Sequence, residues 1–277
     1  MKIKHLLCFI ALCLFFTPGK AQQLSVMTLR NGATVYIWED KSKPDVFGMI
    51  AFKVGSVDDP EQYTGLAHYL EHVMFKGTQT IDALDWEKEK PIYEKIIAKY
   101  DERAALSDPA AREAIDKEIN DLTREAAQYA AGNEFSLLVD HMGGQGLNAS
   151  TGYDQTEYHN SFPPSQLEKW LEIYSERLIG PVFRGFQTEL EAVYEEYNMY
   201  NDDRGSRMRE FIYEQAFGDH PYARPIIGLP EHLKNPQLSK LIDFYNTWYG
   251  PQNMSIILVG NIDAKEAIPM IRDKFER

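Results

Sequence analysis

The pattern of apolar and polar residues predicts strands towards both ends of the chain. Residues 24–40, "LSVMTLRNGATVYIWED", contain two alternating runs separated by an Asn-Gly pair, which is typical of a hairpin turn. A third strand is predicted in residues 46–56, and two more follow the glycine-rich start of residues 142–162. Residues 253–262, "NMSIILVGNI", are apolar almost throughout, so we expect a strand that is buried on both faces.

Helical periodicity fills the middle of the chain and returns at its end. A helix is predicted from about Gly65 to Phe75. Strands at both ends with helices between them favour an α+β domain, in which helices pack on one face of an antiparallel or mixed sheet. The other predicted helices lie at about 165–179, 187–201, 206–217 and 237–248, and from near Ala264 to the end of the sequence.

A charged segment interrupts this order between residues 85 and 131. Asp85 to Glu125 holds 12 acidic and 8 basic residues among 41, so most of its surface must be solvated. Two heptad-like apolar stripes predict two helices that pair as an antiparallel hairpin, and Ser107-Asp108-Pro109 would cap the second helix. We interpret this hairpin as an insertion on the surface of the domain, outside its core and dispensable for the fold. The stripes consist of Tyr93, Ile97, Tyr100 and Ala104 in the first helix and of Ile115, Ile119, Leu122, Ala126 and Tyr129 in the second.

The first 21 residues have the features of a secretory signal peptide. Lys2 and Lys4 form a basic start, and the apolar stretch from Leu6 to Phe16 is too short to span a membrane. Cleavage is expected after Ala21, and a buried core helix is the alternative interpretation of the segment. These features predict an exported protein, periplasmic or secreted. No later stretch is long and apolar enough to cross a bilayer, so we expect no membrane span in the mature protein.

Composition narrows the chemistry further. Cys8 and Cys13 both lie within residues 1–21, so the mature protein would have no thiols, which excludes a cysteine nucleophile and a thiolate metal site. Loss of the three lysines of this segment would change the net charge from −13 to −16. A chain this acidic lacks the basic surface that nucleic acid requires, so no nucleic-acid partner is expected.

Two histidines and a glutamate have the spacing of a zinc site in residues 65–78, "GLAHYLEHVMFKGT". On a helix, His68 and His72 are one turn apart and project from the same face, where both imidazoles can bind one zinc ion. Glu71 can lean over the metal and take a proton from a water molecule whose pKa the metal lowers to about 7. The alternative is an ordinary core helix that carries surface histidines.

A catalytic zinc site needs a third protein ligand, which must be a histidine or a carboxylate in a chain without thiols. In residues 187–205, "QTELEAVYEEYNMYNDDRG", Glu189 and Glu196 are two helical turns apart and share a face. Glu191 and Glu195 fall on other faces of the same helix. From the residues alone, an exposed acidic helix is the competing interpretation of this stretch.

The two motifs together, H-x-x-E-H followed by E-x-x-x-V-x-x-E, resemble those of the inverzincin peptidases, the family of pitrilysin, insulin-degrading enzyme and the mitochondrial processing peptidase. Residues 143–163, "GGQGLNASTGYDQTEYHNSFP", are similar to the strand pair of that family. Residues 244–263, "FYNTWYGPQNMSIILVGNID", are similar to its closing helix and strand. The resemblance runs from about residue 24 to residue 277.

This resemblance implies a zinc ion in the domain and a role for each motif residue. The substrate would be a peptide that adds to the domain as an extra strand and is held mainly through its backbone. The implied roles are binding of one zinc ion per domain for His68, His72 and Glu196, general base for Glu71, orientation of a metal ligand for Glu189, and lining of the substrate cleft for Asn148 and Ala149.

The chain departs from the family in two respects. His72 and Glu196 are 124 residues apart, which exceeds the usual interval, and removal of residues 84–133 would leave 74. We therefore expect a catalytic domain over residues 22–277, with a charged helical insertion at residues 84–133 inside it. The family also builds its chamber from two such units in a clamshell, so the expected partner is a second, zinc-free homologous domain, in the same chain or in trans.

The function predicted from these features is that of a zinc-dependent metalloendopeptidase, which hydrolyses peptides or unfolded polypeptide segments. The alternative within the family is a non-catalytic structural or binding subunit, although such relatives usually lack parts of the zinc motif. A protein that stores or senses metal is a third hypothesis, but it has no need for Glu71 beside the metal. Bound zinc and peptide cleavage, measured together, distinguish the three.

Overall fold

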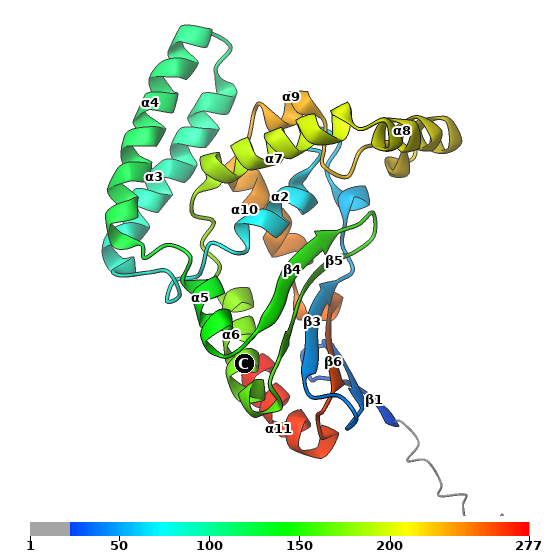
Figure 1. Ribbon diagram of the computed structural model, residues 1–277. Coiled ribbons are helices and arrows are strands. Elements are labelled where there is room, and N and C mark those ends of the chain that lie inside the picture. The colour runs from blue at the N-terminus through cyan, green and yellow to red at the C-terminus, as the bar shows by residue number, and fades with distance from the viewer. Residues whose placement is uncertain (1–22, 277) are drawn as a thin grey trace, which may run out of the picture.

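A computed structural model describes residues 23–276 of the chain (Figure 1). The predicted signal peptide, residues 1–21, and both cysteines, Cys8 and Cys13, lie outside the described residues. Among the residues that are described, no helix is long and apolar enough to cross a membrane.

One six-stranded sheet supports the domain. Its strand order is β1-β2-β6-β3-β5-β4, and every neighbouring pair is antiparallel except β2 and β6, which are parallel. The sheet is therefore mixed, as predicted, and its last strand in sequence lies between two of its first. In sheet order the strands are β1 (Gln23–Thr28), β2 (Thr34–Glu39), β6 (Met254–Gly260), β3 (Val46–Phe52), β5 (Thr156–Phe162) and β4 (Gln145–Thr151).

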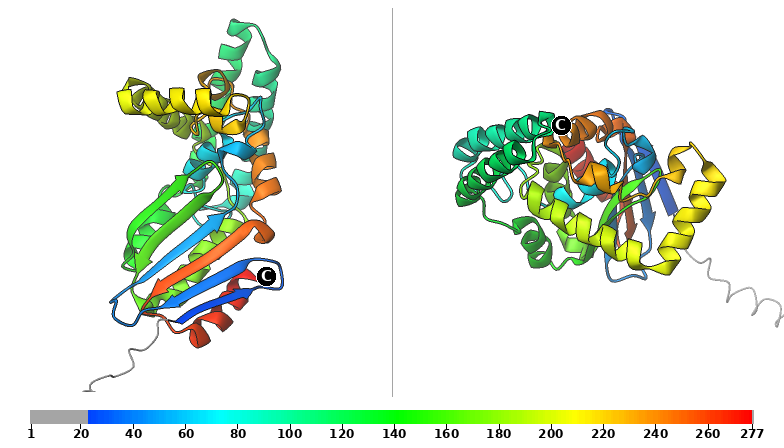
Figure 2. Two further views of the ribbon diagram at one scale, coloured as in Figure 1. Left: turned by 90° about the vertical axis from the view of Figure 1, so that its right-hand side faces the viewer. Right: turned by 90° about the horizontal axis from the view of Figure 1, so that it is seen from above.

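Helices cover one face of this sheet (Figure 2). On β2, Val35 and Ile37 are buried, whereas Tyr36 and Trp38, which point the other way, are exposed. β6 alternates in the same manner, so the prediction of a strand buried on both faces was wrong. The physical reason is that an apolar run can also form a strand whose second face is only half covered, because the helices lie on a single side.

The helices beneath the sheet are α6 (Leu167–Ile179) and α11 (Ala264–Phe275), whereas α10 (Leu238–Trp248) packs on α2 (Leu66–Val73) and α3 (Trp86–Ala105). The helices α6, α10 and α11 were all predicted from their periodicity. Trp170 of α6 is fully buried and lies so close to β3 that a Cβ on Gly48 would be 2.5 Å from its indole ring. Glycine at this position therefore lets α6 pack directly on the sheet.

The charged segment forms the predicted helical hairpin, which projects from the body of the domain (Figure 1). Its helices are α3 (Trp86–Ala105) and α4 (Pro109–Ala126), and Asp108 caps α4 by accepting hydrogen bonds from two backbone N–H groups. The expectation that the hairpin lies outside the core was wrong, however. The apolar side chains of the hairpin pack between its two helices and also against the body of the domain. Tyr100, for example, contacts the ring of Phe186 at a centroid distance of 4.7 Å. The residues of the hairpin that are buried within the core are Ile92, Ile96, Tyr100, Ile115 and Ile119.

A second layer of helices lies across the end of the sheet near β4. α2 (Leu66–Val73) contacts both β4 and α7 (Phe186–Asp202), and α8 (Arg204–Phe217) extends from α7 to the side (Figure 1). The short helices α5 (Glu134–His141) and α9 (Pro230–Leu233) were not predicted, because eight and four residues are too few for a clear helical period.

Candidate metal centre

The helix α2 carries the H-x-x-E-H motif, and buried groups fix where it begins. Gly65 precedes the helix with a φ of 91°, a conformation that favours glycine. The buried carboxylate of Asp59 accepts hydrogen bonds from the N–H groups of Gly65 and Ala67, at 2.7 and 2.9 Å. Desolvation outweighs these bonds and raises the pKa of Asp59 to about 7. Because Leu70 and Val73 are buried against the body, the remaining side of the helix presents its polar residues to α7 and β4.

The helix α7 presents its two predicted acids to α2. Phe186, Leu190 and Val193 are its buried residues, and they attach the helix to the body. Glu189 and Glu196 lie on the side that faces α2, where each comes close to a histidine. Their neighbours Glu191 and Glu195 are exposed, as the helical spacing predicted.

Three side chains converge where α2 and α7 face each other. One ligand atom from each of His68, His72 and Glu196 can be chosen so that all lie within 4.8 Å of one another. The Nε2 atoms of the two histidines are 3.6 and 3.5 Å from Glu196 Oε2, and the two imidazole rings are 4.8 Å apart. The structure thus brings together the three residues that the sequence analysis assigned to the metal, across 124 residues of chain.

The spacing and chemistry of this set fit zinc. Zinc bonds to nitrogen and oxygen are about 2.0–2.2 Å long, so two ligands of a tetrahedral ion stand about 3.4 Å apart. The measured nitrogen–oxygen separations are close to this value and longer than a good hydrogen bond. Two imidazoles and one carboxylate also leave a fourth position open, which is the ligand set of a catalytic rather than a structural zinc site.

Two charged side chains, Glu189 and Lys76, lie on the Nδ1 side of the His72 ring. Glu189 Oε2 is 3.6 Å from His72 Nδ1, the ring nitrogen that points away from Glu196. The other oxygen of Glu189 forms an ion pair with the ammonium group of Lys76. A carboxylate at this nitrogen favours the tautomer that leaves Nε2 free for a metal, and Lys76 restricts the carboxylate to that position. The sequence analysis assigned such a role to Glu189 and missed Lys76.

Glu71 lies beside the three ligands and is held by the sheet. Its Oε2 accepts a hydrogen bond from the Thr151 hydroxyl of β4 at 2.7 Å. Burial raises the pKa of Glu71, although the bond from Thr151 and the nearby His72 oppose this effect. A carboxylate with a raised pKa is a stronger base, which suits it to accept a proton. Thr151 was also missed, since nothing in the local sequence relates it to Glu71, 80 residues earlier.

The two histidines have opposite preferences for a proton. Burial and the neighbouring His72 lower the pKa of His68 to about 4. Burial also disfavours charge on His72, but the carboxylates of Glu189 and Glu196 outweigh it and raise the pKa of His72 to about 9. At neutral pH, His68 is therefore a neutral imidazole, whereas a metal must displace a proton from His72.

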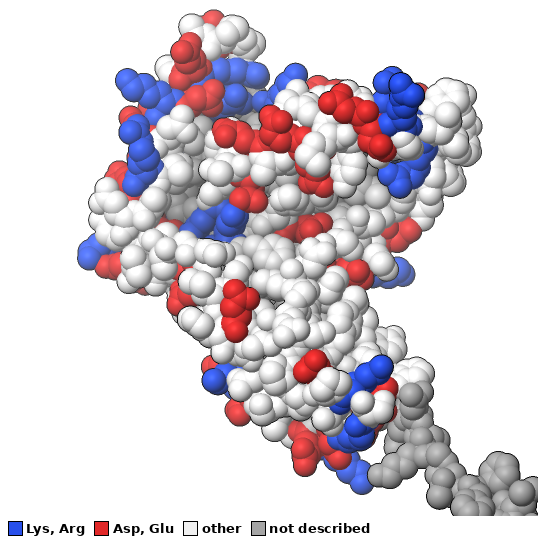
Figure 3. All heavy atoms as spheres, in the orientation of Figure 1, with Lys and Arg blue, Asp and Glu red and all other residues white. Residues whose placement is uncertain are grey.

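A cleft of about 630 Å³ opens over these residues, between α7 and α8 on one side and β4 on the other (Figure 3). Asn148 and Ala149, the two predicted substrate residues, both line it. Within the described part of the chain, β4 is an edge strand of the sheet, so the backbone groups on its free side have no strand partner there. Among the cleft residues that the sequence analysis missed are Tyr153, Tyr200, Arg209, Tyr213, Ile226 and Ile227.

Models of known protein families match most of the described chain. The model of the family described as insulinase (peptidase family M16) matches residues 34–90 and 122–229. A second model, described as the peptidase M16 inactive domain, matches residues 237–277. All the residues of the metal centre lie within the first match, and the unmatched residues 91–121 belong to the helical hairpin.

Curated relatives carry the name of zinc proteases. The chain is 25% identical over 268 residues to the probable zinc protease PqqL of Escherichia coli, a match that covers 92% of this chain and 23% of PqqL. It is 24% identical over 254 residues to the zinc protease PqqE of Helicobacter pylori, covering 90% of this chain and 46% of PqqE. An uncharacterised zinc protease of Mycobacterium leprae is 26% identical over 224 residues, which cover 80% of this chain and 39% of the relative. The chain thus spans less than half the length of each of these proteins.

Solved structures confirm the α+β fold. A protease from Helicobacter pylori superposes with a TM-score of 0.71 at 22% identity, covering 92% of this chain and 50% of that one. The periplasmic protease PqqL from Escherichia coli gives 0.69 at 25% identity, and pitrilysin gives 0.67 at 22% identity. These two matches cover 92% and 94% of this chain but only 24% and 23% of the larger proteins.

Proposed function

Because the chain belongs to the insulinase family of peptidases (peptidase family M16), as its motifs predicted, we propose that it is a zinc-dependent endopeptidase of peptides or unfolded polypeptide segments. The observation that carries the proposal is the convergence of His68, His72 and Glu196 within 4.8 Å, with Glu71 beside them. Zinc in this position would lower the pKa of a water molecule and polarise the carbonyl group of the scissile peptide.

The residues of the chain have distinct roles in this proposal. His68, His72 and Glu196 hold the ion, one per domain, and Glu71 takes the proton of the attacking water and later passes it to the leaving amine. Thr151 orients Glu71 through its hydrogen bond. Glu189, with Lys76 behind it, orients His72.

The substrate would bind along β4. A peptide in extended conformation can pair with the free edge of this strand, which places its backbone beside Asn148 and Ala149 and its scissile bond near Glu71. Recognition through the backbone favours peptides and unfolded segments over folded proteins, because only an extended chain offers free backbone groups.

A second, zinc-free homologous domain, in the same chain or in trans, is proposed to complete the chamber. The greater length of the relatives supports this part of the proposal. The match of residues 237–277 to an inactive domain keeps the alternative of a non-catalytic structural or binding subunit in view. The complete set of metal residues lies outside that match and favours the enzyme.

Export to the periplasm or beyond is also part of the proposal. The signal-like residues 1–21 support it, as does the relative PqqL, which is described as a periplasmic protease. The peptidase domain of the exported protein would comprise residues 22–277 and contain the charged helical insertion at 84–133.

Replacement of Glu71 tests the proposed mechanism. Glu71→Gln should retain bound zinc, because Glu71 is not a ligand, and should lose peptide cleavage by about two to four orders of magnitude. Zinc content and cleavage of an unfolded peptide are measured on the same samples of wild type and variant. A Glu71→Gln protein that cleaves as fast as wild type would contradict the role of Glu71, and wild-type protein without zinc would contradict the metal centre.

A further inference from the structure

Two arginines, one buried and one largely buried, hold the segment that follows α2. Arg177 of α6 donates a hydrogen bond from Nε to the carbonyl oxygen of Met74 at 3.0 Å. Arg184 donates from Nη1 to the carbonyl oxygen of Lys76 at 3.1 Å. Since α2 ends at Val73, both contacts fix the end of the helix that carries the two histidines.

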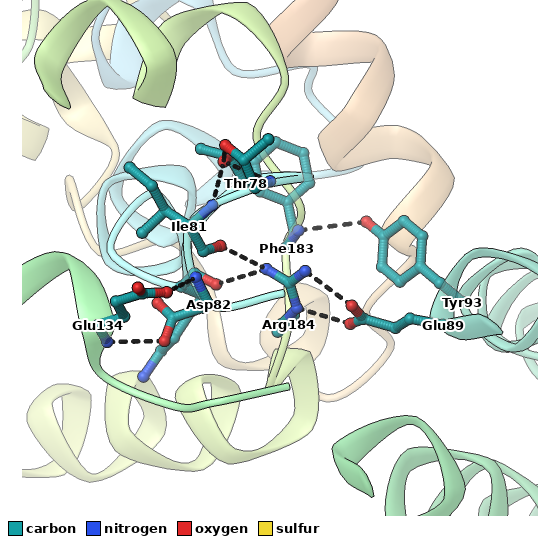
Figure 4. A network of polar contacts seen from close by, with 10 residues as sticks. Thr78, Ile81, Asp82, Glu89, Tyr93, Glu134, Phe183 and Arg184 are labelled. Carbon is teal, nitrogen blue, oxygen red and sulfur yellow. Dashed lines mark hydrogen bonds and ion pairs between the residues drawn. The ribbon is translucent and has the colours of Figure 1, made fainter. Parts of the chain in front are cut away.

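Arg184 is in turn fixed by the charged hairpin (Figure 4). Glu89, in the first turn of α3, accepts hydrogen bonds from Arg184 Nε at 2.6 Å and from Nη2 at 2.8 Å. Glu89 is buried and Arg184 is largely so, with exposed side-chain fractions of 2% and 12%. A guanidinium that meets a carboxylate through two parallel bonds is restricted in orientation as well as in distance. Beside this pair, the Tyr93 hydroxyl accepts a hydrogen bond from the backbone N–H of Phe183 at 3.3 Å.

The start of α5, which follows the hairpin in the chain, holds the same segment. The N–H of Glu134 donates to Asp82 Oδ1 at 2.7 Å, and the N–H of Asp82 donates back to Glu134 Oε2 at 2.5 Å. Asp82 is buried and has a φ of 64°, so these bonds hold a backbone conformation that a residue with a side chain seldom adopts. Residues 76–82 therefore lie between the first turn of α3 and the start of α5, as Figure 4 shows.

Arg184 lies between the charged hairpin and the candidate metal centre. It precedes Gly185 and the start of α7, the helix that carries Glu189 and Glu196. Lys76, whose carbonyl group it holds, pairs through its side chain with Glu189, and Glu189 faces His72. A single guanidinium thus connects the hairpin, the end of α2 and the start of α7.

From these contacts we infer that Glu89 and Arg184 are positioning residues of the metal centre. Their ion pair clamps the charged hairpin to the segment after α2 and to the start of α7, and so sets the separation between His72 and the two acids of α7. The inference rests on the proposed zinc site and extends it: the hairpin, which the sequence presents as a peripheral insertion, helps to maintain the geometry of the ligands.

Two variants and a matched control test the clamp. Glu89→Gln removes the charge at nearly constant shape, and Arg184→Lys keeps the charge but loses the two-bond contact. Asp116→Asn is the control, because it removes a different ion pair of the same hairpin, that with Arg103, away from residues 76–82. Three quantities are measured: backbone hydrogen exchange of the metal-free protein, the Kd for zinc, and the visible spectrum of the cobalt-substituted protein.

In both clamp variants we expect amides in residues 74–82 and 186–190 to exchange at least about fivefold faster than in wild type. The Kd for zinc should rise about tenfold, the lower end of what supporting residues of metal sites contribute, and the cobalt spectrum should change with the ligand geometry. Asp116→Asn should leave all three quantities at their wild-type values.

Exchange rates and zinc affinities of Glu89→Gln and Arg184→Lys that equal those of Asp116→Asn would overturn the inference. A wild-type protein that binds no zinc would instead overturn the proposed function. In that case the exchange of the metal-free protein still decides whether the clamp holds α2 and α7 together, so the two failures are distinguishable.

Discussion

His68 and His72 are one helical turn apart, yet the protein gives them different surroundings. His68 is buried and its pKa is lowered, whereas His72 is half-buried between two carboxylates that raise its pKa. Glu196 lies within 3.6 Å of both rings and would supply the third ligand of the metal ion. At the scale of single residues, the candidate metal centre therefore depends on one carboxylate that comes from a distant part of the chain.

Removal of a proposed ligand should abolish stable zinc binding. We expect about one zinc per chain in the purified wild-type protein and little in His72→Ala or Glu196→Gln after dialysis, because two remaining ligands hold the ion only weakly. Glu195→Gln is the control, since Glu195 is the exposed neighbour of Glu196 on another face of α7. Elemental analysis measures the zinc, and full occupancy in both ligand variants would refute the assignment.

Zinc binding should release about one proton at neutral pH. The pKa of His72 is about 9 and that of His68 about 4, so His72 is protonated below pH 9 and must lose its proton to bind. Its contribution to zinc affinity should be complete above pH 9 and fall about tenfold for each unit of pH below that value. Titration calorimetry in buffers of different ionisation enthalpy counts the protons. No release at pH 7 would contradict the positive charge on His72.

At the scale of the elements, the hairpin α3–α4 does two things at once. Its outer surface is charged and solvated, as the composition predicted, while its inner face contributes Ile92, Ile96 and Tyr100 to the core. Each such side chain stabilises the fold by about 1.5–3 kcal/mol on burial, and loss of a partner from a buried ion pair costs about 3–5 kcal/mol. The base of the hairpin should therefore matter for stability far more than its tip.

Two deletions of different length separate the tip from the base. Replacement of residues 103–112 by a short glycine-serine linker should preserve the fold and zinc binding, because Glu89, Tyr93 and the buried stripe remain. Replacement of residues 84–133 should lower the thermal transition sharply, since the body of the domain loses several buried contacts. Calorimetry and zinc analysis are applied to both proteins. Equal stability of the two proteins would show that the base of the hairpin contributes nothing to the stability of the domain.

At the scale of the whole molecule, the cleft between β4 and the helices α7 and α8 opens to the surface (Figure 3). Figure 3 shows acidic side chains along the outer side of α7, with basic side chains gathered on the hairpin and around α8. The cleft itself is lined by Glu71, Glu196 and Glu210 together with Arg209, and the rest of its lining is divided about equally between polar residues and aromatic or aliphatic ones. An open chamber admits water and provides few groups opposite the scissile bond, which is why we propose that a second domain closes it.

Addition of the second domain should raise cleavage only where Glu71 is intact. Wild type and Glu71→Gln are each assayed on an unfolded peptide, with and without the homologous half supplied in the same chain or in trans. We expect weak cleavage by the isolated wild-type chain, a strong increase in the completed assembly, and hardly any increase for Glu71→Gln. An isolated chain as active as the assembly would refute the need for a partner.

The sequence by itself determined what depends on neighbouring residues. The periodicities predicted the sheet strands, most helices and the helical hairpin, because side-chain spacing along one element is a local property. The pair His68 and His72 and the pair Glu189 and Glu196 were predicted for the same reason, since each pair shares one helix face. The resemblance in these motifs also predicted the family, which the family match confirms.

Only the tertiary structure decided which elements meet. It brought Glu196 to the two histidines, Thr151 to Glu71 and Lys76 to Glu189, contacts that no local spacing specifies. It also showed that part of the charged hairpin belongs to the core. The composition could not reveal this, because one buried ion pair and a few apolar side chains hardly change a segment of 41 mostly charged or polar residues. Spacing along the chain determines which residues share a face, whereas the packing of α2, α7 and β4 against one another determines which faces form a site.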